Sequence, residues 1–126
     1  MVIVITGTSK GLGLHMAKHY LNLKHMVYGC SRSNSSFNHS LYDHTILDLS
    51  NEVEVRSWIK KIKTKHKIID VLICNAALVQ SSLLFSVTPG NIMEAFLKNN
   101  ISGVFYVMRE VSKMMISLSF YWQLKN

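Results

Sequence analysis

The C-terminal segment FYWQLKN contains a tyrosine and a lysine, Tyr121 and Lys125, one helical turn apart. On a helix this spacing places both side chains on one face. A lysine ammonium lowers the pKa of a neighbouring phenol, so such a pair could exchange protons with a substrate at neutral pH. Whether it forms an active site depends on the elements that must position it.

A glycine-rich segment lies near the other end of the chain, between an apolar run and a helical pattern. Residues 2–5 are continuous β-branched residues, which is typical of a strand buried on both faces. Gly7 allows a tight turn, Gly11 lets the backbone approach a pyrophosphate, and Gly13 lets the helix pack close to the sheet. The segment predicts a dinucleotide site at a helix N-terminus. A merely tight strand-to-helix turn is the alternative.

The rest of the chain alternates between expected strands and helices. We expect strands at 26–30, 44–49 and 68–74, and helices at 11–23, from Ser50 onward, and from Thr88–Pro89 to about residue 115. A polar loop at 33–40 joins the second and third strands. This order predicts an α/β fold, namely a Rossmann-type doubly wound parallel sheet of about four strands. We expect residues 1–115 to form a single nucleotide-binding domain, or half-domain, with this fold.

Several local patterns give more specific expectations. Ser50 is predicted to cap the second helix and Thr88 the third, with Pro89 at the first helical position. Ile46 and Leu47 would lie at the centre of the third strand. The second helix would bury an apolar face made of Val53, Val55, Trp58, Ile59 and Ile62.

Composition limits the classes of partner. The net charge is +7, and much of it comes from the lysine-rich run at 60–67. That run is interpreted as a solvated helix end; a nucleic-acid patch is the alternative, but it lacks interleaved aromatic residues. No apolar stretch approaches the roughly 20 residues of a membrane span. Cys30 and Cys74 lie in apolar segments and predict buried thiols in a reducing cytoplasm, with a disulfide as the alternative. We therefore expect no nucleic acid, membrane or metal as a partner.

The residues after the second strand bear on which nucleotide binds. The strand ends in Cys30-Ser31-Arg32-Ser33, without the acidic residue that binds the ribose of NAD. Arg32 can form a fork of hydrogen bonds to a phosphate, and Lys10 adds a second cation nearby. The pair favours NADP over NAD. An ordinary surface arginine is the alternative for Arg32.

Four motifs in order resemble those of the short-chain dehydrogenase/reductase family. They are the TGxxxGxG pattern at 6–13, Asp48-Leu49, Cys74-Asn75-Ala76-Ala77 (similar to NNAG) and Asn100-Ile101-Ser102-Gly103. The resemblance covers residues 1 to about 115. It implies cofactor contacts from Gly7, Ser9, Lys10, Gly11, Leu12, Gly13, Arg32, Asp48, Leu49, Asn75, Ala76 and Ala77.

The resemblance also implies individual roles. Lys10 and Arg32 would hold the 2′-phosphate, and Asp48 would accept a hydrogen bond from the adenine amino group. Asn75 would join the central strands. Asn100 would kink the long helix and hold a water of the proton relay, which makes it the catalytic candidate. A carboxylate in a loop is the alternative for Asp48, and a solvent-facing polar residue is the alternative for Asn100.

In this family hydride passes between the nicotinamide and a small carbonyl or alcohol, with a serine and Tyr-x-x-x-Lys handling the proton. Tyr121 follows Asn100 too closely for the intervening strand and loop, and Met108 stands where the serine is expected. Tyr20 and Lys24 show the same spacing by chance. We therefore expect an amino-terminal half with an atypical tail at 116–126.

Three hypotheses for function remain open. The first is a cofactor-binding fragment of an NADP-dependent oxidoreductase, the second a non-catalytic NADP-binding sensor or interaction module, and the third a complete small reductase using Tyr121 and Lys125. Without further sheet cover the last helix would expose apolar residues, among them Met108, Met114 and Met115. That exposure predicts homo-oligomers formed through the helix around 91–115.

Overall fold

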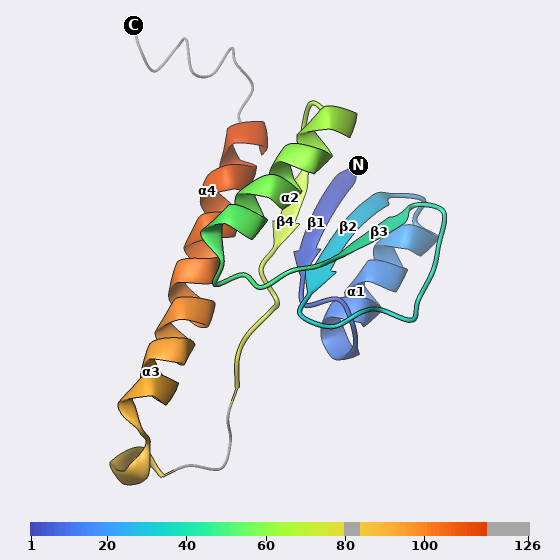
Figure 1. The fold of residues 1–126 in the computed structure, drawn as a ribbon. Coiled ribbons are helices and arrows are strands. Elements are labelled where there is room, and N and C mark those ends of the chain that lie inside the picture. Colours follow the sequence, from blue (N-terminus) through green and yellow to red (C-terminus); the bar gives the residue numbers. More distant parts are fainter. Residues whose placement is uncertain (80–83, 116–126) are drawn as a thin grey trace, which may run out of the picture.

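The fold is built on a parallel β-sheet. The computed structural model describes residues 1–79 and 84–115, and within them the sheet has four strands in the order β3-β2-β1-β4 (Figure 1). The strands are β1 (Val2–Thr6), β2 (Met26–Ser31), β3 (Tyr42–Ile46) and β4 (Val71–Ile73). Every neighbouring pair is parallel. This arrangement confirms the predicted α/β, Rossmann-type class.

Helices cover both faces of the sheet. The helical elements in the described residues are α1 (Gly11–Asn22), α2 (Glu52–Lys65), the short 3-10 turn η1 (Phe85–Val87), α3 (Gly90–Leu97), the π-helical segment η2 (Lys98–Gly103) and α4 (Val104–Met115). Figure 1 shows α1 on one face and α2 with α4 on the other. The three elements α3, η2 and α4 follow one another without a break, as one long helix.

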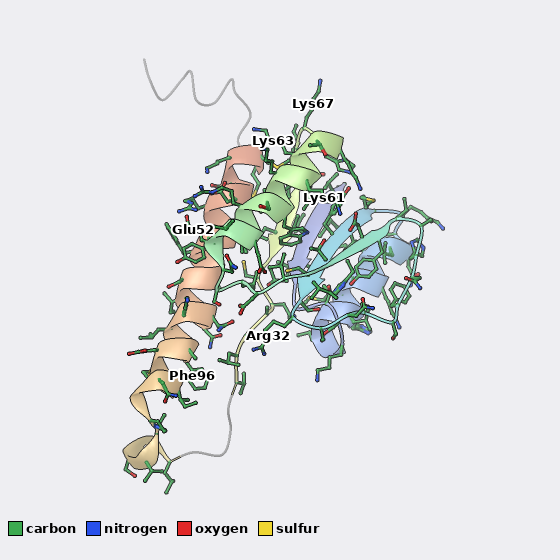
Figure 2. All side chains as sticks on the ribbon, in the orientation of Figure 1. Arg32, Glu52, Lys61, Lys63, Lys67 and Phe96 are labelled. Atoms are coloured by element: carbon green, nitrogen blue, oxygen red, sulfur yellow. The ribbon has the colours of Figure 1, made fainter. Side chains whose placement is uncertain are left out.

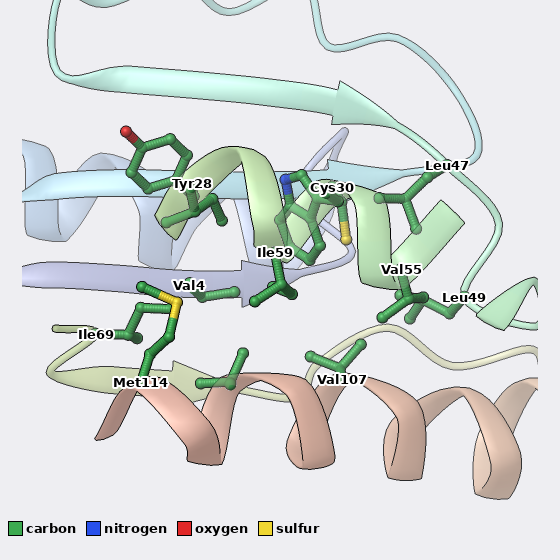
Figure 3. Packing of buried hydrophobic residues seen from close by; sticks show 13 residues of the cluster. Val4, Tyr28, Cys30, Leu47, Leu49, Val55, Ile59, Ile69, Val107 and Met114 are labelled. Carbon is green, nitrogen blue, oxygen red and sulfur yellow. The ribbon is translucent and has the colours of Figure 1, made fainter. Parts of the chain in front are cut away.

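The central strand β1 divides the core into two parts. Ile3 and Ile5 pack in the cluster formed with α1, whereas Val4, on the opposite side of the strand, packs in the cluster formed with α2 and α4. This alternation is the period of two that any strand imposes. Because both faces are covered, the strand reads as an unbroken apolar run. In Figure 3, Val107 and Met114 of α4 reach toward the cluster on the second face.

The methionine exposure expected for the last helix is wrong at one position. Met114 is buried, because α4 packs beside α2 and its side chain enters the shared core. Arg109 of α4 also bonds Glu52 of α2, with 2.7 Å between Nη2 and Oε1. Met108 and Met115 lie on the other face of α4 and are exposed, as expected.

The second helix begins one residue later than predicted. Asn51 rather than Ser50 is its cap, because the Asn51 side-chain oxygen accepts from the backbone N–H of Val53 and Glu54. The Ser50 N–H instead donates to Asp48 Oδ1. Val53 then lies in the first turn on the solvent side, 72% exposed, whereas the other four residues of the predicted apolar face are buried.

Strand ends differ from the sequence prediction. β3 stops at Ile46, which is exposed, while the buried Leu47 lies beyond the strand. β4 is limited to Val71–Ile73, since the β1 residues paired with it are Ile3 to Ile5. Cys74 therefore follows the strand and is exposed, so the prediction of two buried thiols holds only for Cys30.

The predicted threonine cap of the third helix is also wrong. Thr88 Oγ1 donates to the Leu84 carbonyl, 3.0 Å away, and so serves the preceding turn. The helix α3 begins at Gly90 with Pro89 at its cap position. Proline fits there because its missing N–H would have no intrahelical acceptor.

The connection between β2 and β3 packs on the α1 face although it contains no helix. Phe37 and Leu41 contact the cluster formed with α1. Tyr42, which follows them, donates its hydroxyl to Thr8 Oγ1 at 2.9 Å. This packing requires Gly29, because a Cβ at that position would overlap Thr8 Oγ1 and lie 2.8 Å from the Tyr42 hydroxyl.

We predict that Gly29→Ala lowers the free energy of unfolding by about 1–3 kcal/mol, through overpacking at the Thr8–Tyr42 contact. Gly90→Ala is the matched control, since a Cβ there meets nothing within 4 Å, and it should leave stability unchanged or slightly raised. Urea unfolding measures both. Equal stability of the two variants would show that the close approach at Gly29 is not limiting.

Candidate cofactor-binding site

A cavity of about 630 Å³ opens at the carboxyl ends of β1, β2 and β4. This is the place where the order of strands reverses, between β1 and β4, and open α/β sheets bind ligands at such points. Residues that the sequence predicted for the site line much of it: Gly7, Ser9, Lys10, Arg32, Leu49, Asn75, Ala76, Ala77 and the catalytic candidate Asn100. Segments distant in the sequence thus meet at one edge of the sheet.

Other predicted residues lie beside the cavity without lining it. Gly11 and Leu12 begin α1 and are exposed, and Gly13 is buried beneath the turn. Asp48 lies in the turn before α2, where its Oδ1 accepts the Ser50 N–H at 2.9 Å. Its place in the chain, between the lining residues Leu47 and Leu49, keeps it at the rim of the site.

The glycine turn has the geometry that its residue types imply. Gly7 and Gly11 have positive φ, +77° and +61°, which residues with a side chain rarely adopt. The Gly7 N–H donates to the Cys30 carbonyl at 2.7 Å, which holds the turn against β2. A Cβ on Gly13 would overlap the Gly7 carbonyl oxygen. Glycine at position 13 therefore lets α1 begin directly under the cavity.

Asn75 and Thr6 join the ends of β1 and β4. Asn75 Nδ2 donates to the carbonyls of Thr6 and Gly7, at 3.1 and 3.2 Å. In return, the buried Thr6 hydroxyl oxygen accepts the N–H groups of Asn75 and Ala76, both at 3.0 Å. The joining role expected of Asn75 is thus visible in its contacts. The sequence did not predict the role of the Thr6 hydroxyl as an acceptor, although the position of Thr6 at the end of β1 could have indicated it.

Asn100 connects the long helix to the segment after β4. Its Oδ1 accepts the Leu78 N–H at 2.7 Å and its Nδ2 donates to the Leu78 carbonyl at 2.9 Å. It lies in the π-helical segment η2, a local departure from α-helix that is frequent at functional sites. Because both ends of the amide are engaged, the side chain positions the wall of the cavity.

The charges around the cavity are positive. Its described lining contains the cations Lys10 and Arg32 and no carboxylate. Figure 2 shows Arg32 at the carboxyl-terminal edge of the sheet. Cys30 also lines the cavity, but burial raises the pKa of its thiol to about 12, so it stays protonated and is no nucleophile.

Several lining residues were not predicted as part of the site: Cys30, Ser31, Ser33 and Leu47. Asn99, the competing candidate to Asn100, also lines the cavity, as does Leu78 of the apolar loop expected to form one wall. Ser31 and Ser33 flank Arg32 in the sequence, and this adjacency could have predicted that they line the same cavity. The candidate acid and base, Tyr121 and Lys125, lie outside the described residues. Tyr20 and Lys24 share no helix face, because α1 ends before Lys24, whose φ is +64°.

Comparison with known proteins identifies the family. A model of short chain dehydrogenases matches residues 1–119. The chain belongs to this family. An uncharacterized oxidoreductase of Staphylococcus saprophyticus is 28% identical over 94% of the chain. The match covers 54% of that relative, so this chain spans about half the length of the curated relative. The predicted resemblance is confirmed.

Several solved structures share the fold. The ligand-free aldohexose dehydrogenase of Thermoplasma acidophilum superposes with a TM-score of 0.83 at 24% identity, covering 90% of this chain and 44% of that one. ElxO with NADP bound gives 0.80 at 27% identity, over 89% and 49%. A Leptospira borgpetersenii short chain dehydrogenase with bound NAD⁺ gives 0.82 at 19% identity, over 98% and 46%. Proteins of this fold therefore include complexes with either nicotinamide cofactor.

We predict that Thr6→Val destabilises the chain by at least about 1 kcal/mol, because the N–H groups of Asn75 and Ala76 lose their shared acceptor while the side-chain volume is kept. Thr6→Ser keeps the hydroxyl and is the matched control. Chemical unfolding measures the difference. If valine and serine have the same effect, the two hydrogen bonds contribute nothing net.

Proposed function

We propose that this chain is the cofactor-binding part of an NADP-dependent oxidoreductase that transfers hydride between the nicotinamide and a small carbonyl or alcohol. The observation that most supports this proposal is the charge of the cavity at the glycine turn. Among the described residues, Arg32 and Lys10 line this cavity and no carboxylate does. A 2′-phosphate carries up to two negative charges and suits such a lining, whereas NAD-binding sites use an acidic residue there.

The other residues of the site fit the remaining parts of a dinucleotide. The amide groups of the turn at Gly7–Gly13 and the start of α1 would hold the pyrophosphate. Asp48, at the rim, would accept from the adenine amino group, while Leu49 and Ala76 would contact its ring and ribose. When bound, the cofactor supplies or accepts the hydride. Asn100, fixed to Leu78, would hold the wall beside the nicotinamide and a water of the proton relay.

We further propose that proton transfer needs groups beyond this site. Within the part of the chain that the structure describes, the cavity lining contains no tyrosine, and Lys10 is its only lysine. In this proposal residues 1–115 bind the cofactor, and the chain by itself is inactive. A cytoplasmic location is supported by Cys30 and Cys74, both free thiols. No helix in the described residues is long and apolar enough to cross a bilayer.

The direct test is a fluorescence titration of the chain with NADPH and with NADH. We expect NADPH to bind more tightly, and Arg32→Gln to weaken NADPH about tenfold or more while leaving NADH within about twofold, because a charge-assisted contact to a phosphate is lost. Lys63→Gln, on the far end of α2, removes the same charge elsewhere and is the control. Equal affinities of the wild-type chain for the two cofactors would overturn the NADP assignment.

We also propose that the chain forms homo-oligomers through the long helix. Leu97, Ile101, Phe105 and Met108 are all more than half exposed and follow one another along α3, η2 and α4. Isolated exposed apolar residues are ordinary, but a row on one helix is typical of an interface.

Phe105→Glu should shift sedimentation toward the monomer, because a charge would be desolvated in the interface. Val53→Glu, at an even more exposed apolar site on α2, is the control and should leave the assembly unchanged. A wild-type chain that sediments as a monomer at high concentration would contradict this proposal.

A further inference from the structure

The turn that carries Arg32 is held by a hydrogen-bond chain from the neighbouring strand. Ser31 Oγ donates to the Ser33 carbonyl at 2.6 Å, which closes the turn around Arg32. The same oxygen lies 2.8 Å from His44 Nε2. His44 belongs to β3, which pairs with β2 in parallel register. Strand β3 therefore contacts the turn through the His44 side chain, in addition to the backbone ladder that pairs Ser31 with Ile46.

The donors in this chain can be assigned from the partners. A serine hydroxyl has one proton, and here it is directed to the Ser33 carbonyl, so Ser31 Oγ must accept from His44. The imidazole then carries its proton on Nε2 and leaves Nδ1 as a bare acceptor. Burial lowers the pKa of His44, which keeps the ring neutral.

The orphaned nitrogen makes this arrangement unusual. His44 Nδ1 is buried and has no hydrogen-bond partner among the residues that the structure describes. Such a group costs free energy, and one that persists calls for an explanation. The same imidazole forms the hydrogen bond to Ser31, which lies beside the proposed phosphate subsite.

His44 itself does not line the cavity, whereas Ser31, Arg32 and Ser33 all do. Its effect on a ligand must therefore pass through Ser31. Arg32 is exposed and has a long flexible side chain, so the backbone of the turn sets the point from which its guanidinium reaches the cavity. A rigid turn leaves less motion to be lost when the guanidinium meets a phosphate.

We propose that His44 is a positioning residue for cofactor selection: by holding Ser31, it orders the turn that presents Arg32 to the 2′-phosphate and so sets the preference for NADP over NAD. This inference rests on the proposed function. NADH lacks that phosphate, so its binding gains little from an ordered Arg32. Loss of the His44 contact is therefore expected to change the ratio of the NADPH affinity to the NADH affinity.

The test compares two substitutions of His44 that differ in one donor. His44→Gln keeps an N–H close to the place of Nε2, and His44→Leu removes it. We expect His44→Leu to weaken NADPH about tenfold and NADH no more than twofold, and His44→Gln to restore most of the preference. Ser31→Ala should match His44→Leu. The double variant should be no weaker than either single variant, because the two residues act in one chain.

The outcomes separate this inference from the function it rests on. A wild-type chain that prefers NADPH, with His44→Leu and Ser31→Ala weakening both cofactors equally or neither, overturns the role of His44 alone. A wild-type chain without the preference overturns the proposed function and this inference with it. Nitrogen NMR of the free chain gives a check that needs no cofactor: a His44 protonated on Nδ1 instead of Nε2 contradicts the assigned hydrogen bond. Ser31→Ala and His44→Gln carry the test if His44→Leu does not fold.

Discussion

The hydrogen bonds between Thr6 and Asn75 are the interaction on which the rest of the site depends. β4 is short, and its ladder to β1 ends before the cavity begins. Beyond that point, the side chains of Thr6 and Asn75 hold the two backbones together. Asn75 also bonds the Gly7 carbonyl, against which Gly13 and the start of α1 pack. Strand ends, glycine turn and helix are thus fixed at one junction.

A second junction places the opposite wall. The segment after β4 runs away from the sheet, and the paired bonds between Asn100 and Leu78 tie it to the long helix. That helix is anchored in the core by Val107 and Val111 of α4, both fully buried. These two bonds therefore connect the wall to a helix that is anchored in the core. The π-helical segment η2 sits where the helix passes from the core to the cavity.

Electrostatics adds a bias that does not depend on any single contact. With a net charge of +7, the chain attracts anions from a distance, and Lys10 and Arg32 direct that attraction to the cavity. The lysine run on α2 lies elsewhere. Lys65 there pairs with Asp43 of β3, and cations at a helix C-terminus offset the dipole. The positive charge of the chain therefore has two effects: it attracts anions to the cavity, and it stabilises the C-terminus of α2.

The sequence by itself determined the fold class, the order of elements and the glycine turn. These follow from local rules: the period of apolar residues in β1, the special φ of Gly7, and the spacing of motifs along the chain. The exact ends of β3, β4 and α2 did not follow, because pairing with β1 and the competing cap at Asn51 decide them. The sequence also did not predict the exposure of Val53 and Cys74, or the burial of Met114.

The contacts of Ser31 with His44 and of Asn100 with Leu78 join residues far apart in sequence. Only tertiary structure brings them within hydrogen-bond distance, since their geometry depends on how strands and helices pack.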